Sequence, residues 1–152
     1  KAVFDAEDAF RKGRNMLKAG RYEGAHNQFR KAVDRSPDEP QYVAHLRYTE
    51  YMQISKDDHG RVEDEEKANE ILSELKDILG EHEDKPWMYA FIGVVLQGLG
   101  KVGAAERNFQ EALRLDSDNR IAQQRLRLIK MRRNRTDNNS WLDKLLSKLN
   151  LR

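Results

Sequence analysis

Two stretches of this chain carry the same small and aromatic residues at the same spacing. Five residues of the first stretch recur 80 residues later: Gly13, Gly20, Ala25, Phe29 and Ala32 correspond to Gly93, Gly100, Ala105, Phe109 and Ala112. Gly20-Arg-Tyr is typical of a turn between two helices, and Pro37 ends the first unit because the residue before a proline avoids the helical region. Self-similarity at a fixed offset indicates a repeat architecture. We therefore predict an all-α chain of stacked helical hairpins.

The pattern resembles the tetratricopeptide repeat, a helix–turn–helix unit of about 34 residues. A first repeat over about 6–39 has the expected residue types at Gly13, Ala25, Phe29, Ala32 and Pro37, and it departs from the pattern at Ala9 and Lys12. A third repeat over about 86–119 matches at Tyr89, Ile92, Gly93, Ala105, Phe109 and Ala112, and it has Ser117 in the proline position. The resemblance implies a right-handed superhelical solenoid that binds other proteins.

The segment between these repeats, residues 40–85, is about 12 residues longer than one repeat unit. We place the excess at Ser55–Arg61, between a helix that begins at Tyr42 and a second helix that ends at Leu79. A cap helix over 120–133 then completes a solenoid spanning 1–135. A polar linker at 134–139 and a separate amphipathic helix at 140–152 are expected to follow.

The resemblance also implies a binding groove, since in this family the first helix of each repeat lines the inner surface. Carried over to this sequence, the aromatic groove comprises Phe10, Arg14, Leu17, Tyr48, Tyr51, Trp87, Phe91 and Val94. The alternative is that these aromatic side chains only pack between helices. Members that clamp a peptide's terminal carboxylate use Lys, Asn and Arg; no Lys or Arg lies between Trp87 and Gly100, so an apolar ligand face is favoured.

The last helix has its own apolar face: Trp141, Leu142, Leu145, Leu146 and Leu149. An amphipathic helix of about three turns needs a surface to form against. It could cover the solenoid end, dock into a groove of the same or another copy, or lie in a membrane interface with Lys144 and Lys148 at the headgroups.

Charge is distributed unevenly along the chain, although the net charge is only +2. Residues 57–84 contain 12 acids and 3 Lys or Arg, whereas residues 120–135 contain seven bases and no acid. Solvated faces explain both runs, and nucleic-acid contact through the arginine-rich helix is a further alternative.

Other classes of function find little support in the sequence. The four histidines are scattered, and no nucleophile elbow, HExxH or phosphate-binding glycine loop is present. We therefore predict no enzymatic activity, no metal and no cofactor.

The chain has no cysteine and begins at Lys1 without a signal-peptide pattern. Our expectation is a cytoplasmic adaptor or scaffold, part of a larger bacterial protein. Its partner would be a protein or peptide, and self-association through the last helix is a further possibility. A membrane-peripheral module is the main alternative.

Overall fold

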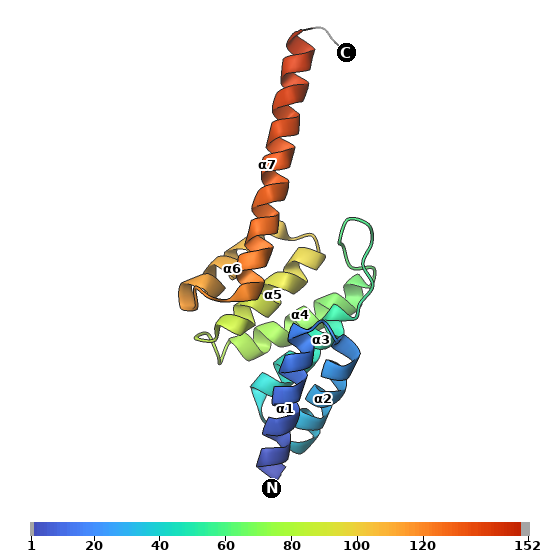
Figure 1. Cartoon of the computed structure of the whole chain (residues 1–152), viewed down its shortest axis with the longest axis vertical. Helices are drawn as coiled ribbons and strands as arrows, with labels where there is room; N and C mark the ends of the chain where they lie inside the picture. Colours follow the sequence, from blue (N-terminus) through green and yellow to red (C-terminus); the bar gives the residue numbers. More distant parts are fainter. Residues whose placement is uncertain (1, 150–152) are drawn as a thin grey trace.

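The computed structural model describes residues 2–149 and the side chains of residues 5–149. These residues form seven α-helices: α1 Ala2–Lys18, α2 Tyr22–Arg35, α3 Pro40–Met52, α4 Glu65–Leu79, α5 Pro86–Gly98, α6 Val102–Leu115 and α7 Arg120–Lys148. Figure 1 shows α1 to α6 as three successive hairpins stacked along the long axis, with α7 extending beyond them. The predicted all-α helical-hairpin solenoid is confirmed.

The repeated glycines bring the two helices of a hairpin together. A Cβ atom on Gly13 would lie 2.6 Å from Cε1 of Phe29, and one on Gly93 would lie 2.5 Å from Cε1 of Phe109. Both phenylalanines are fully buried, as are the alanines one turn away. A side chain at either glycine would therefore collide with the ring that fills the hairpin. This contact is the physical reason for the 80-residue repeat in the sequence.

The buried residues form two hydrophobic clusters along the stack. The smaller cluster joins α1, α2 and the start of α3, and the larger one extends from α3 to α7. Leu17 packs against both clusters, so the first hairpin is continuous with the rest of the core.

The segment between α3 and α4 carries the predicted extra residues, and part of it is fixed to the core. Lys56 and Val62 form an isolated antiparallel bridge, and the Asp57 carboxylate accepts hydrogen bonds from the backbone N–H groups of His59 and Arg61. Val62 is buried and its N–H donates to the carbonyl oxygen of Gly98 at 3.0 Å. The loop therefore attaches the second hairpin to the end of α5.

The end of the chain differs from the prediction. Residues 134–139 are not a linker, because α7 is one helix from Arg120 to Lys148. The last proline of the sequence is Pro86 and the last glycine is Gly103, so neither residue type is available to terminate the helix within 120–149. The prediction of a short cap helix and a separate helix from residue 140 is therefore wrong.

The two halves of α7 have different surroundings. The Asn119 side chain caps the helix by accepting from the N–H of Ala122. Ala122, Leu126 and Ile129 are buried against the solenoid, and the Arg133 guanidinium forms an ion pair with Glu106 of α6. From Lys130 to Leu149 every residue is exposed. The first half of α7 therefore covers the last hairpin, and the second half projects from it.

Candidate functional site

Four rings in contact cross the first helices of the three hairpins, and we call them the aromatic row: Phe10, His45, Phe91 and Tyr48. Their successive centroids are 4.8 Å, 4.9 Å and 3.9 Å apart, and the last pair is stacked at 6°. Trp87 joins the row through His45, at 5.0 Å. Because α1, α3 and α5 each contribute a ring, the row connects all three hairpins on one side of the stack.

His45 is held neutral at the centre of this row. Burial among aromatic rings lowers the pKa of His45 to about 3, with the nearby Arg14 as a weaker contribution in the same direction. Its Nδ1 lies 2.8 Å from the carbonyl oxygen of Gln41, so the neutral ring donates one hydrogen bond within its own helix. The histidine is therefore a polar member of the core and is not placed to exchange protons with solvent near neutral pH.

Most of the predicted groove residues lie below the surface. Phe10, Tyr48, Tyr51, Phe91 and Val94 are buried, Leu17 and Trp87 are half-buried, and Arg14 is exposed. Packing between helices, the alternative considered for the aromatic side chains, therefore describes the four buried rings, and Val94 is buried with them. Leu17, Trp87 and Arg14 remain accessible to a partner.

Two cations lie over these aromatic rings, and the positive charge of a third, Arg125, acts on the pKa of Tyr48 and Tyr51. The Arg14 guanidinium is 5.8 Å from the Phe10 ring centroid, and the Lys56 ammonium is 4.9 Å from that of Tyr51. Arg125 of α7 donates to Oε1 of Gln97 at 3.2 Å. Burial lowers the pKa of Lys56, and the positive charge of Arg125 lowers it further. Among the described residues none of the three forms an ion pair. This surface therefore carries uncompensated positive charge beside aromatic rings, and we call it the cationic face.

The sequence analysis assigned only one of these three cations, Arg14, to the binding groove. Arg14 follows from its position in the first repeat, whereas Lys56 arrives from the inserted loop and Arg125 from the last helix. Neither position belongs to the inner helix of a matched repeat. The absence of Lys and Arg between Trp87 and Gly100 therefore does not leave the cationic face without charge.

A polar cleft of about 680 Å³ lies between α2, the end of α3 and the start of α4. Its lining comprises His26, Arg30, Glu50, Gln53, Ile54, Ser55, Glu63, Asp64 and Lys67. His26 Nε2 lies 3.3 Å from Oε1 of Glu50, a carboxylate that also accepts from Arg47. The lining combines three acids with two permanent cations, so it presents no single charge sign to a ligand. No group of three or more His, Asp or Glu residues within the described part of the chain is arranged to hold a metal.

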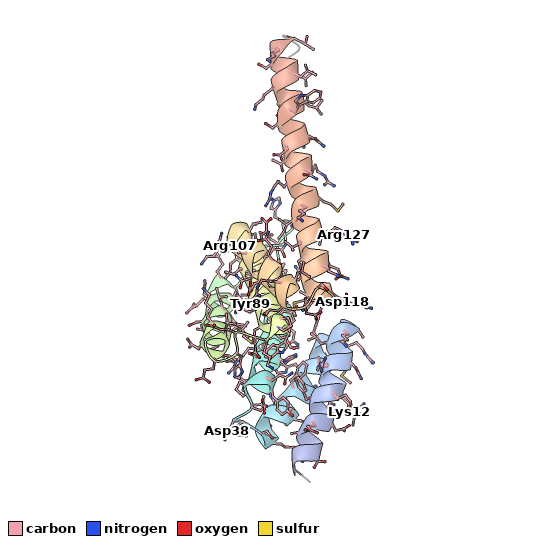
Figure 2. All side chains as sticks on the ribbon, turned by 90° about the vertical axis from the view of Figure 1, so that its left-hand side faces the viewer. Lys12, Asp38, Tyr89, Arg107, Asp118 and Arg127 are labelled. Atoms are coloured by element: carbon pink, nitrogen blue, oxygen red, sulfur yellow. The ribbon has the colours of Figure 1, made fainter. Side chains whose placement is uncertain are left out.

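The apolar residues of the predicted docking helix are all exposed. Trp141 is 63% exposed, and Leu142, Leu145, Leu146 and Leu149 range from 38% to 57%. Figure 2 shows the side chains of this part of α7 standing away from every other helix. The helix therefore does not cover the solenoid in this structure, which was one of the three roles expected for it. None of the described helices is long and apolar enough to cross a membrane.

The arginine-rich run of α7 is partly used within the fold. Arg125 faces Gln97 and Arg133 faces Glu106, so two of its cations contact the solenoid. The remaining bases are exposed.

Solved structures with the same arrangement of helices are tetratricopeptide-repeat domains. One is the first TPR of Spaghetti (RPAP3), which is 19% identical, covers 85% of this chain and 93% of that one, and has a TM-score of 0.57. The second TPR domain of human RPAP3 is 19% identical over 85% of this chain and 95% of that one, with a TM-score of 0.54. A thermophilic TPR protein of Thermus thermophilus is 16% identical over 93% of this chain and 73% of that one, with a TM-score of 0.62.

These likenesses establish the class of fold. The protein has a tetratricopeptide-repeat fold, as the spacing of its glycines, alanines and phenylalanines predicts. No protein-family model and no curated protein matches the sequence.

Proposed function

We propose that this protein is a protein–protein interaction module that binds an acidic peptide segment on the cationic face. Arg14, Lys56 and Arg125 supply the positive charge there, and the half-buried Leu17 and Trp87 supply accessible apolar surface. The observation that carries the proposal is that Arg14 and Lys56 lie over aromatic rings, and that neither they nor Arg125 forms an ion pair with any acid in the described part of the chain.

The chemistry of such a face favours carboxylates next to apolar side chains. A cation already placed over an aromatic ring loses little side-chain freedom when it binds a carboxylate, so less conformational entropy opposes binding. Two solved domains of the same fold support this ligand class. One holds the HSP90 peptide SRMEEVD and the other the HSP70 peptide SGPTIEEVD, and both peptides end in two glutamates, a valine and an aspartate.

Fluorescence anisotropy with a labelled SRMEEVD peptide tests the proposal. We expect saturable binding that weakens with salt, because screening acts on charge contacts. A peptide with Gln and Asn in place of the acids should bind at least about tenfold more weakly, a difference of about 1.4 kcal/mol. A C-terminally amidated peptide measures the contribution of the terminal carboxylate.

Variants locate the binding surface. Arg14→Ala, Lys56→Ala and Arg125→Ala should each weaken binding about 3- to 10-fold, equivalent to about 0.7–1.4 kcal/mol. Arg107→Ala is the matched control, because this arginine is exposed on α6 (Figure 2) and is not one of the three cations of the cationic face. Equal affinity for acidic and neutral peptides, or equal losses at Arg107 and Arg125, would contradict the proposal.

A further inference from the structure

Five exposed apolar residues of α7 lie in one line along the helix, which we call the α7 stripe, and the exposed Trp141 and Leu146 flank it. Its positions are Leu128, Met131, Arg135, Asn138, Leu142, Leu145 and Leu149, separated alternately by three and four residues. This alternation is the seven-residue pattern of helices that pair along a seam. Five of the seven positions are apolar, and Leu128 and Met131 are 44% and 55% exposed although they lie beside the solenoid.

The stripe faces away from the solenoid. At about 100° per residue, Ala122, Leu126 and Ile129 lie on one side of α7, and the stripe lies on roughly the opposite side. The first group is buried, and every stripe residue is exposed. A partner placed along the stripe therefore meets the whole line without contacting α5 or α6.

We propose that the partner of the α7 stripe is the α7 stripe of a second copy, lying antiparallel to it. In one antiparallel register, apolar residues of one stripe face apolar residues of the other, and polar residues face polar ones. Leu128 faces Leu145 of the other copy, Met131 faces Leu142, and Arg135 faces Asn138. Each pairing occurs twice by symmetry. The four Leu128–Leu145 and Met131–Leu142 layers are apolar, the two Arg135–Asn138 layers are polar, and Leu149 faces Gln124 at each end of the pair.

The charge of α7 selects the antiparallel arrangement over the parallel one. A parallel pair would place Arg135 against Arg135 and align the two arginine-rich halves, in which residues 120–135 carry seven bases and no acid. The antiparallel pair places each arginine-rich half beside the leucine-rich half of the other copy. Arg127 and Lys148 become the nearest like charges, at exposed positions where salt screens them.

The same residues fit a lipid surface less well. A helix lying in a membrane interface needs one continuous apolar side. Arg135 and Asn138 interrupt that side in the middle of the stripe, so it is continuous only over residues 141–149, where Trp141 and Leu146 widen it. In the antiparallel pair these two residues face each other, and the asparagine amide can accept a hydrogen bond from the guanidinium.

Analytical ultracentrifugation of the whole chain tests the pairing. Because the stripe is narrow, we expect a weak dimer, with the mass rising from 17.8 kDa toward twice that value as the protein concentration increases from about 5 to about 500 µM. A Leu142→Asp, Leu145→Asp variant should weaken dimerisation at least about tenfold. Both leucines are exposed in the single copy, so this variant is expected to fold.

A matched variant controls for the added charge. Ser140→Asp, Ser147→Asp introduces the same two carboxylates in the same part of the helix but on the side away from the stripe, and it should still dimerise. A chain that remains at 17.8 kDa throughout overturns the proposal. Binding of that monomer to phosphatidylglycerol vesicles, lost in the Leu142→Asp, Leu145→Asp variant, would assign the stripe to a lipid surface instead.

Cross-linking determines the orientation, and the absence of native cysteine makes the experiment clean. A Met131→Cys chain is mixed with an isotopically heavy Leu142→Cys chain and treated with a short bis-maleimide. Antiparallel pairing predicts mixed-mass dimers joined between positions 131 and 142. Equal-mass dimers joined at 131–131 or 142–142 indicate parallel pairing and overturn the proposed register.

Discussion

Phe29 and Phe109 each fill a hairpin by lying on a glycine of the preceding helix. The ring of Phe109 occupies the space where a side chain on Gly93 would stand, and Phe29 has the same relation to Gly13. These pairs explain at atomic scale why the sequence repeats glycine and phenylalanine at one spacing. The pattern predicted the hairpins because steric exclusion leaves little choice at those positions.

Gly93→Ala should destabilise the protein by about 1–3 kcal/mol, because the added methyl group overpacks the hairpin against Phe109. Gly103→Ala is the matched control, since the nearest group to its new Cβ would be an arginine nitrogen 3.8 Å away. Helix propensity predicts a neutral or slightly stabilising effect there. Urea denaturation of both variants measures the difference, and equal stability would contradict the packing role of Gly93.

His45 makes stability depend on pH through its buried ring. Its folded pKa of about 3 lies below the ordinary value of 6.5, so the unfolded chain binds more protons between these pH values. The stabilising contribution is therefore complete above about pH 6.5 and declines as the pH falls toward about 3.

The expected loss from this residue between pH 7.5 and pH 5 is about 2 kcal/mol, at about 1.4 kcal/mol per pH unit below 6.5. His45→Phe keeps a ring in the aromatic row without a titrating group. Urea denaturation at the two pH values should show the wild type losing about 2 kcal/mol more than this variant. Equal losses in the two proteins would mean that His45 is not buried as a neutral ring.

At the scale of elements, a helix or loop could be predicted from the sequence where local residues determine its boundaries. The hairpins and the inserted loop were predictable, because glycines, prolines and polar turns mark their boundaries. The continuity of α7 was not, since the polar residues 134–139 resemble a linker. Thr136 donates from its hydroxyl to the carbonyl oxygen of Arg132 at 3.0 Å, which is compatible with an uninterrupted helix. Polar composition alone does not end a helix when no Gly or Pro follows.

The inserted loop shows a second feature that the sequence did not predict. Its composition is polar, yet one of its residues, Val62, is buried. Val62 is 5% exposed, whereas Val102 on α6 is 42% exposed. Val62→Ala should cost about 2 kcal/mol through the cavity it leaves, and Val102→Ala should change stability by less than about 0.5 kcal/mol. Thermal or urea denaturation measures both changes. Indistinguishable stabilities for the two variants would show that the loop does not anchor α3 to α5.

At the scale of the whole molecule, the polar cleft, the cationic face and the α7 stripe are formed by different residues. The cationic face could be predicted only in part. Aromatic residues at inner positions were identified from the repeat, but five of the eight groove residues are buried, because packing between neighbouring hairpins uses the same side of each helix. Lys56 and Arg125 come from a loop and a terminal helix, whose positions no repeat register defines.

The two tryptophans allow the most direct test of the proposed function. Trp87 touches His45 and Phe91 beside the cationic face, whereas Trp141 stands on the projecting half of α7. Their indole N–H groups give two distinct signals in a ¹H–¹⁵N NMR spectrum. Titration with SRMEEVD should move the Trp87 signal in proportion to bound peptide and leave the Trp141 signal in place. An unmoved Trp87 signal at saturating peptide, or a shift confined to Trp141, would contradict peptide binding on the cationic face.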